Sequence, residues 1–181
     1  MLDVHREIDL LNFYRASELH GGLILAQLAR RVRDPQLLLA LTRHAAEEVV
    51  HAQCWTETIL TLGGVPRPVR DTYQARYARV LHAPMSLFHV LALTQVFERR
   101  VFRHFTLHLR RPGTHPAVCA TLRRLLDEER DHLSWVKTWL DHQEKVRGRD
   151  LVVRTMREFA DADETIYAEL CDEYGFAQAA A

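Results

Sequence analysis

Two short stretches of the sequence place a glutamate three residues before a histidine. The first is "EEVVHAQCWTE", with Glu48 and His51, and the second is "DEERDHLSW", with Glu129 and His132. Residues three apart on an α-helix share a face, so each pair directs a carboxylate and an imidazole to the same side. These two groups together bind divalent transition metals. The motif alone is weak, because 13 glutamates and 11 histidines in 181 residues give roughly one such pair by chance.

Composition narrows the function classes. The 24 acidic residues balance the 24 basic ones, so no overall field favours nucleic acid. Cys54, Cys119 and Cys171 are far apart and form no C-x-x-C motif, which argues against a disulfide framework or a cysteine metal site. The apolar run "GGLILAQLA" is too short to span a bilayer and is not placed like a signal peptide. We therefore expect a cytoplasmic protein that binds neither a membrane nor nucleic acid.

Hydrophobic periodicity predicts an all-α chain. Apolar residues recur every three or four positions, and no strand-like alternation stands out. Helices are expected at residues 4–32, 35–62, 72–81, 84–109, 116–146 and 150–174. Asp34-Pro35 marks the start of the second helix, Pro84 that of the fourth, and Gly148 ends the fifth. The last residues, "AQAAA", are expected to fray.

Four of the long helices carry a glutamate in the middle of the apolar stripe. They are Glu18, Glu48, Glu98 and Glu129. A carboxylate buried without compensation is costly, so four of them argue for a shared counter-charge. Glu18 lies about as far before the turn at Asp34 as Glu48 lies after it, and Glu98 and Glu129 flank the turn at Pro112 in a similar way. In antiparallel hairpins each pair would then lie at nearly the same height, at ~1.5 Å per residue.

The glutamates of the two hairpins must also lie at the same height along the bundle. Glu48 and Glu98 lie at nearly the same depth in their helices, counted from Pro35 and Pro84, so they coincide only if these helices run parallel. The segment 63–83 can make the required crossover of about 40 Å as a short helix plus about nine extended residues. The spacing also repeats, since the separation between Glu18 and Glu98 differs by a single position from that between the two motifs. All six side chains can therefore converge at the centre of a bundle.

This set resembles the ligand set of ferritin-like di-iron carboxylate proteins, in which two helices each give a Glu and two others each give Glu-x-x-His. The resemblance covers residues 1 to about 146 and is nearest to the rubrerythrin and bacterioferritin type, without a rubredoxin domain. It implies an up-down-down-up four-helix bundle with a long crossover between the second and third bundle helices. An additional C-terminal helix at 150–174 completes a single domain over residues 1–181.

By that pattern Glu18 and Glu98 would each bind one ion, and Glu48 and Glu129 would bridge the two. His51 and His132 would each complete one ion. The implied cofactor is two iron ions, with manganese or zinc as alternatives because such sites do not select iron by affinity. Four carboxylates balance two divalent cations, and without metal some of them must protonate.

Residues beside these ligands carry weaker predictions. Glu47 and Glu128 would each hydrogen-bond the histidine of the opposite motif, with a solvated helix acid as an equal alternative. Tyr14 and Gln95, a turn before Glu18 and Glu98, would hydrogen-bond a ligand or a bound oxygen species. Rubrerythrins place a further glutamate near the position of Gln95, which puts a strict rubrerythrin peroxidase cycle in doubt.

Several other residues have two interpretations. Gly21 and Gly22 would either leave a small cavity or allow close helix packing. His44 is expected in the core or beside the ligands. His104 and His108 are interpreted as a surface pair in preference to a rival i, i+4 metal site. Arg99, Arg100 and Arg103 are interpreted as a solvated face in preference to a basic patch for a nucleic acid or an acidic partner.

The resemblance implies a di-iron oxidoreductase that reduces dioxygen or hydrogen peroxide, with or without oxidation of an organic substrate. Its electrons would come from a separate donor protein. Ferrous iron oxidation and storage, or a passive metal-binding helical bundle, are the alternatives. The C-terminal helix would cap the bundle or form a homodimer.

Overall fold

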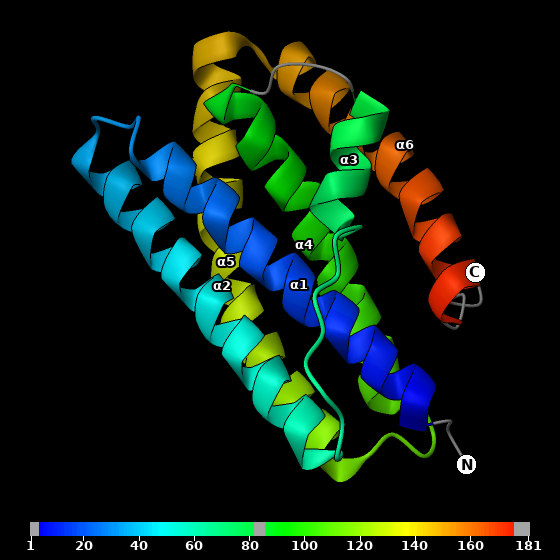
Figure 1. Ribbon diagram of the computed structural model, residues 1–181. Helices are drawn as coiled ribbons and strands as arrows, with labels where there is room; N and C mark the ends of the chain where they lie inside the picture. The colour runs from blue at the N-terminus through cyan, green and yellow to red at the C-terminus, as the bar shows by residue number, and fades with distance from the viewer. Residues whose placement is uncertain (1–3, 82–85, 176–181) are drawn as a thin grey trace. The chain divides into compact units, whose positions relative to one another are not determined.

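The computed structural model describes residues 4–81 and 86–175, and throughout these residues the regular secondary structure is helical (Figure 1). This confirms the all-α class. The helices are α1 (Val4–Ala29), α2 (Pro35–Thr61), α3 (Tyr73–Leu81), α4 (Leu87–Arg110), α5 (Pro116–Arg147) and α6 (Arg149–Tyr174).

Local chemistry explains where the helices begin and end. Asp34 caps α2, because its Oδ1 accepts a hydrogen bond from the Leu37 N–H at 2.7 Å, and Pro35 occupies the first helical position. Gly63 after α2 and Gly148 between α5 and α6 have φ values of 75° and 91°, a conformation that favours glycine. Helix α4 begins at Leu87 behind a Ser86 cap. The predicted start at Pro84 and the alanine tail both lie outside the described residues.

The chain divides into two compact units. The first comprises residues 1–76 and 112–121, and the second comprises residues 77–111 and 122–181. Helices α3 and α5 therefore each contribute residues to both units. The two units are described separately below.

In the first unit, α1 and α2 pack along their lengths as a hairpin (Figure 1). The buried side chains of this unit include Leu11, Leu25, Leu41, Trp55 and Ile59. A Cβ atom on Gly22 would lie only 3.0 Å from the Ala45 carbonyl oxygen. Glycine at this position therefore allows the two helix backbones to approach closely.

The connection after α2 runs back along α1. The Arg67 N–H donates to Asn12 Oδ1 at 2.6 Å, the Arg15 side chain donates to the Arg67 carbonyl at 2.8 Å, and Gln74 Nε2 donates to the Ser17 carbonyl at 3.0 Å. Residue numbers rise together along both segments, so this connection and α1 run in the same direction. The segment predicted to cross over therefore travels along the hairpin and ends in the predicted short helix.

The second unit contains α4, most of α5, and α6. Arg147 at the end of α5 lies 5.1 Å from the Phe88 ring at the start of α4, and Arg130 lies 6.0 Å from the Phe102 ring, so these helices run in opposite directions. Helix α6 packs on α4, and its apolar stripe is buried against the rest of its own chain. That stripe includes Phe159, Ile166 and Leu170.

Candidate metal centre

All six predicted ligands are buried. The exposed fractions are 5 % for Glu18, 4 % for Glu48, 0 % for His51, 3 % for Glu98, 2 % for Glu129 and 1 % for His132. Glutamate is almost never fully buried unless it is paired or bound to a cation. The interruptions in the apolar stripes are therefore real features of the packed interior.

The first unit brings three of these ligands together. Glu18 on α1 and Glu48 and His51 on α2 each offer one ligand atom, and these atoms lie within 4.8 Å of one another. The Trp55 indole Nε1 donates to Glu18 Oε1 at 3.4 Å from the next turn of α2. This contact orients the Glu18 carboxylate, and it was not predicted. The sequence signal for this contact is the spacing on α2, because Trp55 follows His51 by four residues and so shares its face.

His44 contacts the same carboxylate. Its Nε2 lies 3.1 Å from Glu48 Oε1, and the residue is 1 % exposed. His44 precedes Glu48 by four residues, whereas His51 follows it by three, so α2 carries an imidazole on each side of one carboxylate. The sequence predicted His44 only as a core residue or a neighbour of the ligands.

The second unit holds the other three ligands. Glu98 on α4 and His132 on α5 offer ligand atoms within 4.8 Å of each other. His132 Nδ1 lies 3.3 Å from Glu129 Oε2, as the helical spacing of three predicts. Each unit therefore contains two glutamates and the histidine of one Glu-x-x-His motif.

These donor sets fit a divalent transition metal. Carboxylate oxygen and imidazole nitrogen suit iron, manganese and zinc, and the three cysteines contribute nothing to the two sets. The buried Glu and His groups could therefore hold a metal ion, and their chemistry does not choose among these metals.

The two neighbouring glycines have different roles. A Cβ on Gly21 would lie 3.2 Å from Glu48 Oε2 and 3.3 Å from Gln74 Nε2, whereas a Cβ on Gly22 would meet the Ala45 backbone. Gly21 therefore allows the Glu48 and Gln74 side chains to pack closely on α1, and Gly22 allows the two helix backbones to approach. Both positions match the close-packing interpretation, and Gly22 also lines the open groove between α1 and α2.

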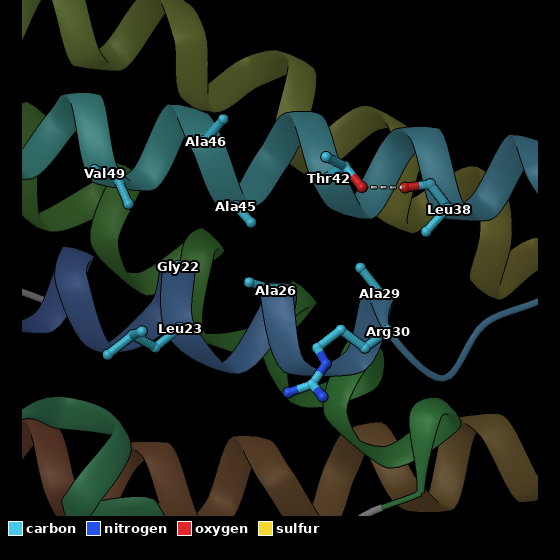
Figure 2. A pocket seen from close by; sticks show the side chains of 10 residues that line it. All are labelled: Gly22, Leu23, Ala26, Ala29, Arg30, Leu38, Thr42, Ala45, Ala46 and Val49. Atoms are coloured by element: carbon cyan, nitrogen blue, oxygen red, sulfur yellow. Dashed lines mark hydrogen bonds between the residues drawn. The ribbon is translucent and has the colours of Figure 1, made fainter.

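An open groove of about 460 Å³ lies between α1 and α2 in the first unit (Figure 2). Small and apolar side chains line most of it, including Gly22, Ala26, Ala45 and Ala46. None of the candidate ligands is among its lining residues. The groove is therefore separate from the residues that could bind a metal.

The other predicted neighbours are mostly buried. Tyr14 packs against the Trp55 ring with centroids 5.1 Å apart. Gln95 is 2 % exposed, and its Oε1 atom has no hydrogen-bond partner among the described residues. Glu47 is half-buried. Glu128 is half-buried and accepts a hydrogen bond from Arg124 Nε at 3.1 Å on its own helix. Hydrogen bonds from Glu47 or Glu128 to the opposite histidines stay predictions.

The prediction that His104 and His108 form a surface pair is wrong. These residues are 8 % and 4 % exposed, because α6 packs on α4. His104 Nδ1 lies 3.0 Å from the Tyr167 hydroxyl. Burial, with the nearby His108 and Arg100, lowers the pKa of His104 to about 3.

Arg100 also departs from the predicted solvated face. Its Nε donates to Asp163 Oδ2 at 2.6 Å, and only 17 % of its side chain is exposed. The sequence periodicity of α4 alone could not show this, because the partner of Arg100 comes from α6.

No described helix is both long and apolar enough to cross a membrane. Comparisons with models of protein families, with curated proteins and with solved structures find no match. The resemblance to ferritin-like proteins therefore stays a prediction from the sequence.

Proposed function

We propose that the protein is a di-iron carboxylate oxidoreductase. The observation that carries this proposal is that each unit buries two glutamates and the histidine of one Glu-x-x-His motif. We propose that these six residues bind two ions as one dinuclear centre, as in the ferritin-like up-down-down-up bundle that the sequence resembles. The connection that runs back along α1 supports this topology, because parallel second and third bundle helices require it.

The proposed roles are those that the resemblance to ferritin-like proteins implies. Glu48 and Glu129 would bridge two ions, Glu18 and Glu98 would each bind one, and His51 and His132 would each complete one. When bound, two ferrous ions supply electrons for the reduction of dioxygen or hydrogen peroxide. The chain contributes the burial of these side chains, the Trp55 N–H that donates to Glu18, and the close packing of Glu48 against Gly21.

The proposal predicts two ions per chain after anaerobic reconstitution with ferrous iron. Glu48→Ala and Glu129→Ala should each lose at least one ion, measured by elemental analysis. Glu57→Ala is the matched control, because Glu57 is an exposed glutamate on the same helix as Glu48. Full metal content in both Glu48 and Glu129 variants would show that the ligands are misassigned.

Mixing the ferrous protein with dioxygen or peroxide then separates the functions. Rapid oxidation of two irons per chain supports the oxidoreductase. Continued uptake of many more irons would indicate iron oxidation and storage. A fully loaded protein that reacts with neither oxidant would be a passive metal-binding bundle.

A further inference from the structure

We propose that His44 is a third imidazole ligand of the metal centre, which makes its two ions unequal. This inference rests on the proposed dinuclear centre and adds a ligand that the Glu-x-x-His motifs do not contain. It starts from the contact between His44 Nε2 and Glu48 Oε1 at 3.1 Å.

That distance is typical of two donor atoms bound to one metal ion. With metal–ligand bonds of about 2.0–2.2 Å, adjacent donors around one ion lie roughly 3 Å apart. His44 is 1 % exposed and is itself among the residues whose ligand atoms cluster with Glu48. An imidazole in that position can therefore bind the same ion as Glu48 Oε1.

His44 and His51 belong to different clusters of possible ligand atoms, and Glu48 belongs to both clusters. The two histidines are seven residues apart on α2, which separates their backbones by about 10.5 Å along the helix axis. Glu48 lies between them and has two carboxylate oxygens. Each oxygen can therefore serve one ion, with His44 beside the ion on Oε1 and His51 beside the other.

The consequence is an asymmetric centre with four carboxylates and three imidazoles. Three imidazoles cannot be shared equally by two ions, so one ion would have an extra nitrogen ligand and one fewer open position.

Cobalt(II) takes the same ligands and provides a direct count of the imidazoles. In the proton NMR spectrum of the full chain loaded with two cobalt ions, each bound imidazole gives one strongly shifted N–H signal that disappears in D₂O. We expect three such signals in the wild type and two in His44→Gln. The glutamine retains an N–H that can reach Glu48, so only the metal bond is removed.

The control is His20→Gln, which should leave three signals because His20 bonds the Thr72 hydroxyl, away from the ligand set. His44→Gln should also weaken binding of one cobalt ion by more than about 100-fold, since loss of a residue that only hydrogen-bonds a ligand costs roughly 10- to 100-fold.

Two shifted signals in a wild-type protein that binds two cobalt ions would overturn the inference and leave His44 as a hydrogen-bond donor to Glu48. That spectrum is decisive even if the variant fails to fold. If the wild type binds fewer than two cobalt ions, the proposed dinuclear centre is wrong. The proposal that His44 is one of its ligands then fails as well.

Discussion

Glu48 is the residue at which most of the observed contacts meet. His44 lies against one of its oxygens, Gly21 lets the other pack closely on α1, and the ligand atoms of Glu18 and His51 lie within 4.8 Å. A buried carboxylate with so many polar neighbours is held in one orientation, which is what a bridging ligand needs. Substitutions around Glu48 should therefore affect metal binding more than folding.

Trp55 offers a test of such an effect. Trp55→Phe keeps a buried ring and removes the N–H that donates to Glu18 Oε1. We expect metal affinity to fall by about 10- to 100-fold, as is typical when a ligand loses its hydrogen-bond partner. Competition with a chelator measures this affinity. Trp139→Phe, in the other unit, is the control, and an equal loss in both variants would argue against a specific contact.

The two glycines of α1 should respond differently to alanine. In Gly22→Ala the new Cβ meets the Ala45 carbonyl at 3.0 Å, and backbone cannot easily move, so stability should fall by about 1–3 kcal/mol. In Gly21→Ala the close atoms belong to the side chains of Glu48 and Gln74, which can shift, and alanine favours the helix by up to about 1 kcal/mol.

Gly21→Ala should therefore fold at least as stably without metal and bind metal more weakly. Urea unfolding of both variants, with and without metal, measures the two effects. The assignment of separate roles fails if the apo proteins lose equal stability.

The burial of single polar residues was predictable where they interrupt the apolar stripe of a helix. Each glutamate interrupts an apolar stripe, so its burial follows from its neighbours in sequence. The contacts of Trp55 and Gln74 depend on rotamers and on a second chain segment, which no local pattern specifies. The prediction for His104 was wrong for the same reason. This residue lies off the Glu98 stripe, and it is buried by α6, a helix that comes much later in the chain.

Between the helices α4 and α6, a partly buried polar network adds to the apolar packing. Arg100 donates to both Asp163 and Glu164, and the Tyr77 hydroxyl donates to Asp163 Oδ1 at 2.5 Å. Burial, followed by the charge of Asp163, strongly raises the pKa of Tyr77. Asp163 is therefore the centre that fixes α6 against α3 and α4 within the second unit.

Asp163→Ala should destabilise the protein by about 3–5 kcal/mol, because it leaves the Arg100 charge and the Tyr77 hydroxyl without their shared acceptor. Asp161→Ala, an exposed position on the same helix, is the control and should change stability by less than about 0.5 kcal/mol. Chemical denaturation measures both values. Similar small losses would mean that α6 is held by its apolar face alone.

His104 should give this region a pH dependence. Its pKa is about 3 in the folded state and 6.5 when unperturbed. The unfolded chain therefore binds the proton first, so stability is full above about pH 6.5 and falls towards pH 3, by about 1.4 kcal/mol per unit within that window. His104→Asn should flatten the slope measured by unfolding curves. His142→Asn, at an exposed site, should leave it unchanged, and an unaltered slope in both variants would contradict the assignment.

The helices themselves were predicted closely, because caps, glycines and prolines act locally. The short helix at Tyr73–Leu81 and the start of α5 at Pro116 lie within one residue of their predicted positions. Helix α1 ends three residues before the predicted Val32, in a stretch where turn residues and apolar periodicity overlap. How α6 would use its apolar stripe was left between two alternatives, and the structure places that stripe against its own chain.

At the scale of the whole molecule, the spacing of the predicted ligands supports a single dinuclear centre, which neither unit shows by itself. The spacing from Glu18 to Glu98 nearly equals the spacing from one Glu-x-x-His motif to the other. A dinuclear centre formed by two similar hairpins would produce such a repeat, and each unit contains half of the predicted ligand set. The repeat says nothing about a second subunit or an organic substrate, because neither leaves a periodic trace in one chain. A homodimer and a cytoplasmic location stay predictions.

The source of electrons is the last property that the chain as a whole constrains. Returning an oxidised pair of irons to the ferrous state takes two electrons. The three cysteines are isolated, with Cys54 and Cys171 buried. Burial raises the pKa of the Cys171 thiol, which disfavours the reactive thiolate. The described residues contain no strand followed by a glycine-rich turn that would bind a nicotinamide cofactor.

We therefore expect one turnover per load of ferrous iron unless a separate electron-donor protein is supplied. Stopped-flow absorbance should show fast oxidation by dioxygen or peroxide that then stalls, and NADH or NADPH alone should not restart it. Adding a reduced small electron-transfer protein should restart it, because the donor then lies outside the chain. Glu57→Ala, which keeps the proposed ligands, should behave like the wild type. Sustained turnover with a nicotinamide cofactor and no second protein would show that the chain carries its own path for electrons.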